Sequence, residues 1–290
     1  MKRRGYRILP ALAVLLAVLA GCGEKPVPIV EPTPTPAPSA APAPAEFALV
    51  CYPDSSFHPL TGDNRTNLSL GGLLYEGLFA LDSHFQPQPV LCREFTMSED
   101  ACVWSFTLRA QAAFSDGSPL SAQTAAACLN QARTSPLYAG RLSDVSTVRA
   151  EGERVVITLR APNGNLPALL DVPICLGEGQ RPLGTGPYRL SEEGDGLFLQ
   201  ARSDWWQGGT PPRDKIPLHP LRTADEMIQA FDTRLASLVS TDLTASNALG
   251  FSGSFETTDY PTSVMLFLGF NLRQGPCQDA VVRQALQRAA

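Results

Sequence analysis

The chain has 290 residues, with 23 basic and 28 acidic side chains, and its net charge is −5 at neutral pH. This acidic balance argues against nucleic acid as a partner, because that affinity comes largely from Lys and Arg side chains that neutralise phosphates. The length is sufficient for about two or three lobes with hydrophobic cores of their own.

The N-terminus has the pattern of a bacterial lipoprotein signal peptide. Basic residues 2–4 precede an apolar run over residues 8–20, which is too short to span a bilayer comfortably. Cys22 directly follows Leu19-Ala20-Gly21. We expect residues 1–21 to be removed and Cys22 to carry lipid, which places the protein at the cell membrane on its extracellular or periplasmic face. An ordinary secretory signal, in which the cysteine is incidental, is the alternative.

Residues 22–46 form the lipidated cysteine and a proline-rich linker. Prolines between positions 26 and 44 alternate with Thr, Ala and Ser, so the segment cannot build a hydrophobic core. Such a chain favours an extended conformation of ~3.1 Å per residue and could hold a folded head up to ~70 Å from the membrane. Disorder without a spacing role is the alternative. No later apolar run approaches the length of a membrane span.

The Cys and His residues do not form the pattern of a metal or catalytic site. The six other cysteines lie at positions 51, 92, 102, 128, 175 and 277, without a C-x-x-C pair or a nearby histidine. Their apolar neighbours favour buried free thiols over disulfides. The three histidines, at positions 58, 84 and 219, lie near prolines in predicted loops. We therefore expect no catalytic residue, no metal and no cofactor, and the chain is not predicted to be an enzyme.

Hydrophobic periodicity predicts alternating strands and helices after residue 46. A helix capped by Asn64 or Thr66 is expected to carry a leucine stripe at positions 70, 73, 74 and 78. Ser121 is predicted to cap another helix, and Asp116 to be a turn residue before Gly117. Strands are expected at 47–52, 94–98, 103–109, 145–148, 154–159, 197–201, 235–241 and 263–271. Helices are expected at 122–133, 166–170, 224–231 and after Asp279.

Two further patterns limit the interpretation. Gly184-Thr185-Gly186-Pro187 precedes a predicted strand, so it does not match a phosphate-binding loop, which opens a helix. The last helix keeps an apolar face up to residue 290, and no later segment of the sequence could cover it. We therefore expect the chain to be truncated at its C-terminus.

Seven motifs, in this order and behind the lipoprotein signal, resemble those of the bacterial extracellular solute-binding proteins, family 5, from peptide and nickel ABC importers. They are Phe57-His58-Pro59-Leu60, Leu74-Tyr75-Glu76-Gly77-Leu78, Trp104-Ser105-Phe106-Thr107-Leu108-Arg109, Phe114-Ser115-Asp116-Gly117-Ser118-Pro119-Leu120-Ser121-Ala122, Gly184-Thr185-Gly186-Pro187-Tyr188, Trp205-Trp206 and Phe270-Asn271.

The resemblance implies an α/β fold like that of the type II periplasmic binding proteins. It has two lobes with an inserted extra subdomain, and here the second lobe would be largely missing. Residues 47–58 would form the first strand of lobe I, residues 59–162 the inserted subdomain and residues 163–262 the remainder of lobe I. Residues 263–290 would form a crossing strand and the start of lobe II.

The resemblance also implies a ligand site between the lobes. Tyr138, on a loop of the inserted subdomain, is expected to contact the ligand, and Tyr138→Ala should weaken peptide binding while leaving the melting temperature nearly unchanged. The full predicted set is Asp54, Ser55, Tyr138, Ser240, Thr241, Asp242, Val264 and Met265.

We expect the protein to capture oligopeptides or dipeptides and to deliver them to the permease and ATPase subunits of an ABC importer, as a monomer whose only contact with the membrane is its lipid anchor. Two alternatives stay open at this point. The same fold could serve a lipid-anchored receptor or sensor accessory without transport, or it could bind a nickel chelate or another small solute. An extracellular hydrolase is a more distant possibility.

Overall fold

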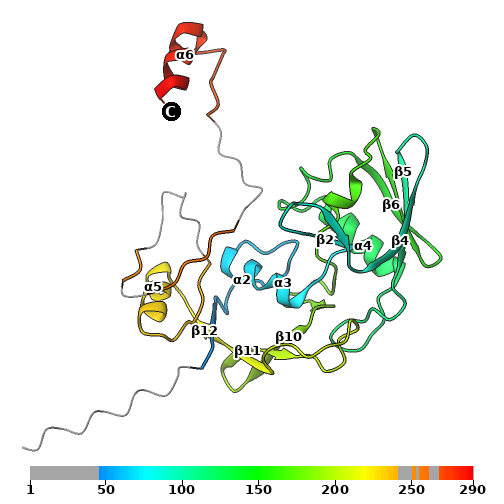
Figure 1. Cartoon of the computed structure of the whole chain (residues 1–290), viewed down its shortest axis with the longest axis vertical. Helices are drawn as coiled ribbons and strands as arrows, with labels where there is room; N and C mark the ends of the chain where they lie inside the picture. The colour runs from blue at the N-terminus through cyan, green and yellow to red at the C-terminus, as the bar shows by residue number, and fades with distance from the viewer. Residues whose placement is uncertain (1–45, 241–249, 253–254, 261–267, 290) are drawn as a thin grey trace, which may run out of the picture. The chain divides into compact units, whose positions relative to one another are not determined.

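Two four-stranded sheets organise the part of the chain that the structure describes (Figure 1). The structure is a computed structural model, and it describes residues 46–240, 250–252, 255–260 and 268–289. No helix within these ranges is long and apolar enough to cross a membrane.

The first sheet has the strand order β1-β12-β11-β10. Its strands are β1 (Leu49–Cys51), β12 (Lys215–Pro220), β11 (Gly196–Ala201) and β10 (Tyr188–Glu193). β1 and β12 run parallel, whereas the other neighbours are antiparallel. Helix α5 (Ala224–Asp232) packs through Met227 and Ala230 on the face that carries Val50, while Leu49 on the opposite face joins the main core. Both faces of the short strand β1 are therefore covered.

The second sheet is antiparallel and has the order β4-β5-β7-β6. Its strands are β4 (Cys92–Met97), β5 (Val103–Leu108), β7 (Arg154–Leu159) and β6 (Val145–Glu151). Alternate β5 residues are buried, and the rings of Trp104 and Phe106 stack with their centroids 5.9 Å apart. Helix α4 (Ala122–Ala132) packs against β6 and β7, and the Ser121 hydroxyl caps it by accepting a hydrogen bond from the Thr124 amide.

Shorter elements connect the two sheets and complete the described chain. They are α2 (Arg65–Ser69), α3 (Gly71–Leu74), β2 (Phe79–Leu81), β3 (Pro87–Pro89), β8 (Cys175–Leu176), β9 (Leu183–Gly184), α6 (Ala280–Ala289) and the 3₁₀ turns η1 (Leu166–Leu169) and η2 (Pro276–Gln278).

Several elements agree with the sequence-based expectations. The strands expected at 94–98, 103–109, 145–148 and 154–159 form the second sheet, and α4 and α5 begin and end within about one residue of the predicted bounds. Asp116 accepts hydrogen bonds from the Ser118 amide and hydroxyl, so it is a turn residue. Asp279 caps α6 by accepting from the Val281 amide.

Two expectations about secondary structure were wrong, and a third is largely untested. The helix expected to start at Asn64 is broken into α2 and α3, because Gly71 and Gly72 follow Leu70 and weaken a continuous helix. Residues 235–240 form no strand, although Ser237 bonds to both backbone groups of Ala48. The expected strand over residues 263–271 lies largely outside the described residues, and residues 268–271 form no strand.

Strand β12 was missed because it contains two prolines. Proline lacks the amide hydrogen that a central strand normally donates, so it argues against such an assignment. Here Pro217 precedes Leu218, the first residue paired with β1, and Pro220 is the last. The prolines therefore mark the limits of the parallel pairing.

Gly184 and Gly186 are required by a close approach of two backbone segments. A Cβ atom at Gly184 would lie 1.9 Å from the Leu74 carbonyl oxygen, and one at Gly186 would lie 2.6 Å from that of Leu73. The Gly186 amide donates to the Leu74 carbonyl at 3.0 Å. This glycine motif therefore packs the start of β10 against the end of α3, which explains why it is not a phosphate-binding loop.

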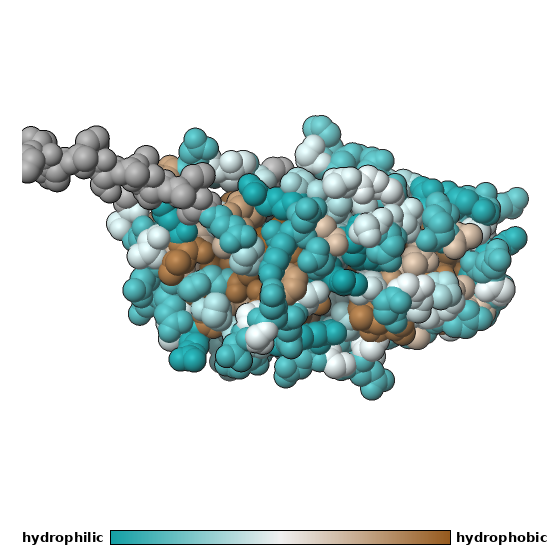
Figure 2. Space-filling view, turned by 90° about the horizontal axis from the view of Figure 1, so that it is seen from below, coloured by the Kyte–Doolittle hydropathy of each residue, from teal (hydrophilic) through white to brown (hydrophobic). Residues whose placement is uncertain are grey.

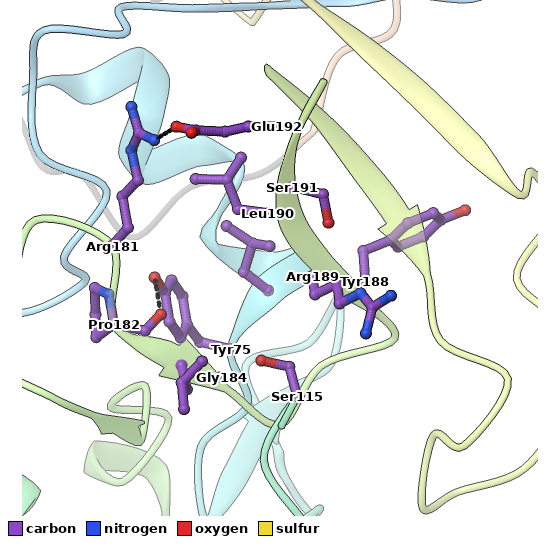
Figure 3. Close-up of a pocket in the computed structure, with 12 residues that line it drawn as sticks. Tyr75, Ser115, Arg181, Pro182, Gly184, Tyr188, Arg189, Leu190, Ser191 and Glu192 are labelled. Carbon is purple, nitrogen blue, oxygen red and sulfur yellow. Dashed lines mark hydrogen bonds and ion pairs between the residues drawn. The ribbon is translucent and has the colours of Figure 1, made fainter. Parts of the chain in front are cut away.

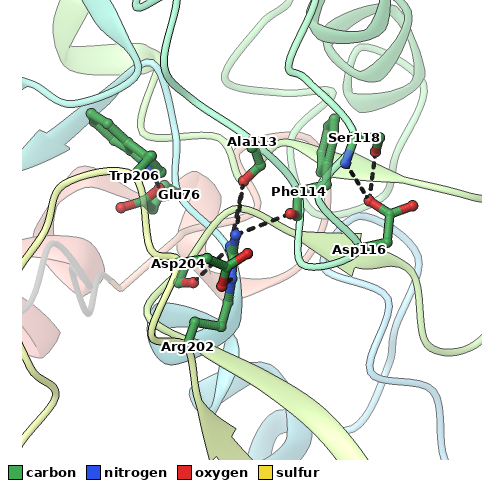
Figure 4. A network of polar contacts seen from close by, with 9 residues as sticks. Glu76, Ala113, Phe114, Asp116, Ser118, Arg202, Asp204 and Trp206 are labelled. Atoms are coloured by element: carbon green, nitrogen blue, oxygen red, sulfur yellow. Dashed lines mark hydrogen bonds and ion pairs between the residues drawn. The ribbon is translucent and has the colours of Figure 1, made fainter.

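The side chain of Arg202, which follows β11, is buried with only 1% exposed, and it binds the loop between β5 and α4 as well as the segment before β10 (Figure 4). Its guanidinium donates to the Phe114 carbonyl at 3.0 Å, to the Gly186 carbonyl at 3.2 Å and to the Ala113 carbonyl at 3.4 Å. Its Nε donates to the exposed Asp204 carboxylate at 3.3 Å. Because a buried cation is costly without partners, these carbonyls must stay in place.

We predict that Arg202→Met lowers the free energy of unfolding by about 3 kcal/mol, because it leaves several buried carbonyl groups without a donor. Arg189→Met is the matched control, since Arg189 is exposed on the adjacent strand β10, and we expect a change below about 0.5 kcal/mol. Urea denaturation measures both values. Equal stabilities of the two variants would show that the guanidinium does not hold the two sheets together.

Candidate functional site

The loop that follows β1 lies at the carboxyl end of a parallel strand pair. Cys51, the last residue of β1, is paired with Pro220, the last residue of β12, so the loops after both strands leave the same edge of the sheet. In open α/β sheets, ligands bind outside the carboxyl ends of the strands. Residues 52–55, here named the β1 loop, are therefore the candidate site, and they include the predicted ligand residues Asp54 and Ser55.

A buried amide, that of Asn67 on α2, fixes the shape of the β1 loop. This side chain is 1% exposed. Its Oδ1 accepts from the Tyr52 amide at 2.9 Å, and its Nδ2 donates to the carbonyls of Tyr52 at 2.8 Å and Ser55 at 3.2 Å. Asn64 holds Asn67 in turn, because its Oδ1 accepts from the Asn67 amide at 3.0 Å. The loop is therefore held in one conformation before any ligand binds.

Tyr52 connects the β1 loop with the loop that follows β12. Its hydroxyl donates to the Thr223 carbonyl at 3.2 Å. Burial, with a smaller effect from the Glu226 charge, raises the pKa of Tyr52, so the hydroxyl keeps its proton. Glu226 also accepts from the Arg222 amide at 2.6 Å, which fixes the start of α5. The β1 loop and the loop after β12 are therefore connected to each other at the same edge of the sheet.

The side chains at this edge of the sheet are suited to binding a ligand through hydrogen bonds. Asp54 is exposed and Ser55 is half-buried, so a carboxylate and a hydroxyl are available to a ligand with hydrogen-bond donors. His58, three residues further on, is buried, and burial lowers its pKa, so its ring is neutral at neutral pH. Its Nδ1 accepts from the Leu60 amide at 3.2 Å and so has a structural partner.

The structure does not bring all the predicted ligand residues together. Tyr138 is half-buried against the main core, with the Arg141 guanidinium 5.4 Å from its ring centroid. The hydroxyls of Ser240 and Tyr260 lie 3.0 Å apart. Within the described ranges, no hydrogen bond or ion pair joins Tyr138 or Ser240 to the β1 loop. The other predicted residues, Cys22, Thr241, Asp242, Val264 and Met265, lie outside the described residues.

The packing of Tyr138 changes one expectation. Arg141, which covers its ring, also pairs with Asp171, so Tyr138 belongs to a packed cluster and is not a freely exposed contact. Removing a half-buried aromatic ring loses packing against its neighbours. The expectation that Tyr138→Ala leaves the melting temperature nearly unchanged therefore does not agree with this packing.

Glu76 is a half-buried carboxylate to which the sequence analysis assigned no role of its own. It accepts hydrogen bonds from Trp206 Nε1 at 2.7 Å and Gln207 Nε2 at 2.6 Å. Burial raises its pKa above the ordinary value of 4.5, although the hydrogen bonds act in the opposite direction. Its backbone pairs with that of Ile174. Glu76 therefore attaches the segment after β11 to the chain between α3 and β2, and its partners give it a structural role.

Two pockets lie elsewhere. One, of about 330 Å³, is lined by Tyr75, Ser115 and Arg189, and the ion pair between Arg181 and Glu192 neutralises two of its charges (Figure 3). The other, of about 540 Å³, is mainly apolar and includes Phe47, Leu49, Leu73, Ile216 and Leu238. The face seen in Figure 2 is mostly hydrophilic, with separate hydrophobic patches. Neither of these two pockets is lined by a residue of the β1 loop.

The described ranges contain no group of three or more His, Cys, Asp or Glu side chains arranged to hold a metal ion.

The sequence did contain a signal for Asn67, because this residue falls on the same helical face as Leu70 and Leu74. A polar residue within an apolar stripe requires a partner if it is buried. Glu76 gives the same signal within the apolar run from Leu74 to Leu78.

We predict that Asn67→Leu lowers the free energy of unfolding by about 2 to 3 kcal/mol, since the substitution leaves backbone groups of Tyr52 and Ser55 without partners at similar side-chain volume. Asn165→Leu is the control, because Asn165 is exposed. Denaturant titration gives the stabilities, and amide hydrogen exchange at Tyr52 reports the loop directly. If the hydrogen-exchange rate of the Tyr52 amide were the same in Asn67→Leu as in the parent protein, Asn67 would not hold the β1 loop.

Comparisons with known proteins agree with this architecture. The family model described as Bacterial extracellular solute-binding proteins, family 5 Middle, matches residues 86–290. The glutathione-binding protein GsiB of Salmonella paratyphi A is 26% identical over 256 residues, which cover 81% of this chain and 50% of that protein. The chain thus spans about half the length of the curated relatives that it matches.

Two solved structures share the fold. The binding protein MoaA from A. tumefaciens R10, in complex with mannopinic acid, has a TM-score of 0.56 and 20% identity, over 67% of this chain and 44% of that one. The oligopeptide-binding protein AppA from Bacillus subtilis, in complex with a nonapeptide, has a TM-score of 0.55 and 16% identity, over 66% of this chain and 43% of that one.

These similarities confirm the predicted α/β fold of the type II periplasmic binding proteins. The relatives are solute-binding proteins and not enzymes, as predicted. Because the family model matches more than half of the chain, this protein belongs to the bacterial extracellular solute-binding proteins, family 5.

Proposed function

We propose that the chain is part of a lipid-anchored solute-binding component of an ABC importer, which captures oligopeptides or dipeptides and delivers them to a membrane permease. The observation that carries the proposal is the β1 loop, fixed by Asn67 and open to solvent at the carboxyl ends of two parallel strands. Family membership supports the same class of function.

Peptides are the ligand class that this loop suits best. The Asp54 carboxylate is exposed and can pair with the ammonium group of a peptide, and the Ser55 hydroxyl can accept or donate a hydrogen bond. The relatives named above include a glutathione-binding protein and an oligopeptide-binding protein. Recognition through backbone hydrogen bonds would allow the pockets for side chains to remain tolerant.

Delivery requires a conformational change and no covalent step. A solute that makes more contacts in a closed form than in an open form shifts the population towards the closed form. The closed form would then dock on the permease, whose ATPase subunits supply the energy for transport. In this proposal the protein acts as a monomer.

The domain limits are part of the same proposal. Residues 47–58 and 163–262 form lobe I, residues 59–162 the inserted subdomain, and residues 263–290 the crossing strand and the start of lobe II. Thr241, Asp242, Val264 and Met265 would complete the ligand site together with Ser240 and Tyr138.

Lipid on Cys22 would anchor the protein to the membrane. We expect the protein to incorporate labelled palmitate and the Cys22→Ser variant to lose this label. Label that persists in Cys22→Ser would rule out this anchor.

Thermal-shift and calorimetric titrations of the full-length protein test the ligand class. We expect glutathione, a dipeptide or an oligopeptide to stabilise the protein saturably, by about 2.7 kcal/mol at a concentration one hundred times the Kd. Asp54→Asn should weaken that binding about five-fold, whereas Asp195→Asn, in the exposed turn between β10 and β11, should not.

Two outcomes would contradict the peptide proposal. One is that no peptide shifts the melting temperature. The other is that only a nickel–histidine chelate does so. Binding of a peptide that Asp54→Asn leaves unchanged would instead remove Asp54 from the site.

A further inference from the structure

Two cysteines from distant parts of the chain have their sulfur atoms in contact. Cys128 lies on α4 and Cys175 on β8, 47 residues apart, and their Sγ atoms are 3.9 Å from each other. The Cys175 amide donates to Cys128 Sγ at 3.4 Å, and the Cys128 thiol is 3.5 Å from the Pro173 carbonyl. Both side chains are buried. Within the described residues, no other pair of cysteine sulfurs makes such a contact.

The surroundings of Cys128 favour a reactive thiolate. Hydrogen bonds from the thiol and the amide of Cys175 lower the pKa of Cys128 against the opposing effect of burial. Burial instead raises the pKa of Cys51 to about 12 and that of Cys92 to about 11. Because the thiolate is the nucleophile in disulfide exchange, Cys128 is the better attacking group among these buried cysteines.

We propose that Cys128 and Cys175 form a reversible disulfide that joins α4 to β8. Disulfide formation requires the sulfurs, which already make contact, to approach from 3.9 Å to about 2.05 Å. Formation in the cell rests on the proposed export, since disulfides persist outside the cytoplasm.

The reaction balances with a small disulfide, such as oxidised glutathione, as oxidant. The Cys128 thiolate attacks one sulfur of the oxidant, the oxidant's S–S bond breaks, and one thiol leaves with a proton. Cys175 then attacks the Cys128 sulfur of the mixed disulfide and releases the second thiol. Two protein thiols lose two electrons and two protons, and one disulfide becomes two thiols.

An oxidant can reach this pair through local opening of a small hairpin. β8 and β9 pair through only two residues each, and the loop between them is held mainly through the carbonyls of Gln180 and Pro182, so local opening must break these bonds. Oxidation can also occur during folding, before α4 and β8 have packed together.

The disulfide would also stiffen the support of the candidate site. In the loop between β8 and β9, the Gln180 carbonyl accepts from the Phe57 amide at 2.8 Å and from the Ser56 hydroxyl at 3.3 Å. Ser56 and Phe57 directly follow the β1 loop. A covalent bond at Cys175 therefore limits how far this supporting loop can move away from the site.

Peptide mapping of the full-length protein carrying Cys22→Ala tests the proposal directly. The protein is refolded in a glutathione redox buffer, alkylated, digested without reduction and analysed by mass spectrometry. We expect a cross-linked peptide that contains Cys128 and Cys175, and a phosphine reductant should then lower the melting temperature by roughly 5 to 10 °C.

Variants supply the control. The reductant should have no such effect on Cys128→Ser or Cys175→Ser, whereas Cys102→Ser, at a half-buried position outside the pair, should respond like the parent protein. Two free thiols at positions 128 and 175 after refolding would overturn the proposal, and this result does not depend on any variant folding. It would leave solute binding untouched, since the titrations with a dipeptide or an oligopeptide without cysteine involve no thiol chemistry.

Discussion

A buried cation is the constraint on which the arrangement of the two sheets depends. Arg202 leaves the end of β11 and places its guanidinium among the carbonyls of Ala113, Phe114 and Gly186. Its carboxylate partner, Asp204, is exposed, so these backbone acceptors provide most of the compensation for burying the charge. The turn after β5 and the start of β10 must therefore remain beside each other.

The candidate site depends on this arrangement through a short series of contacts. Gly186 packs on the end of α3 and donates to Leu74, and the next residue, Tyr75, donates its hydroxyl to the Phe57 and Pro182 carbonyls at 3.2 Å each. Phe57 follows the β1 loop, whose other side is held by Asn67. The β1 loop is thus held by polar contacts that are already formed in the free protein. Because the loop is ordered before a ligand arrives, binding costs little conformational entropy.

Sequence reasoning succeeded where local chemistry decides the structure. The strands of the second sheet and the helices capped by Ser121 or Asp279 were predicted, because capping and periodicity depend on neighbours in the chain. It failed where distant segments decide: β12 contains two prolines, and it pairs with β1, which lies far away in the sequence. The same limit applies to the site. Asp54 and Ser55 could be placed in one loop, and periodicity marks Asn67 as a polar residue on an apolar face, but it does not specify that Asn67 binds the backbone of this loop.

A crystal structure of the full-length protein with a bound peptide tests most directly whether the β1 loop binds the ligand. We expect atoms of the peptide to lie within hydrogen-bond distance of the β1 loop, and Asn67 to keep its bonds to Tyr52 and Ser55 in the bound form. A peptide seated instead in the pocket lined by Arg181 and Glu192, with the β1 loop facing solvent, would contradict it.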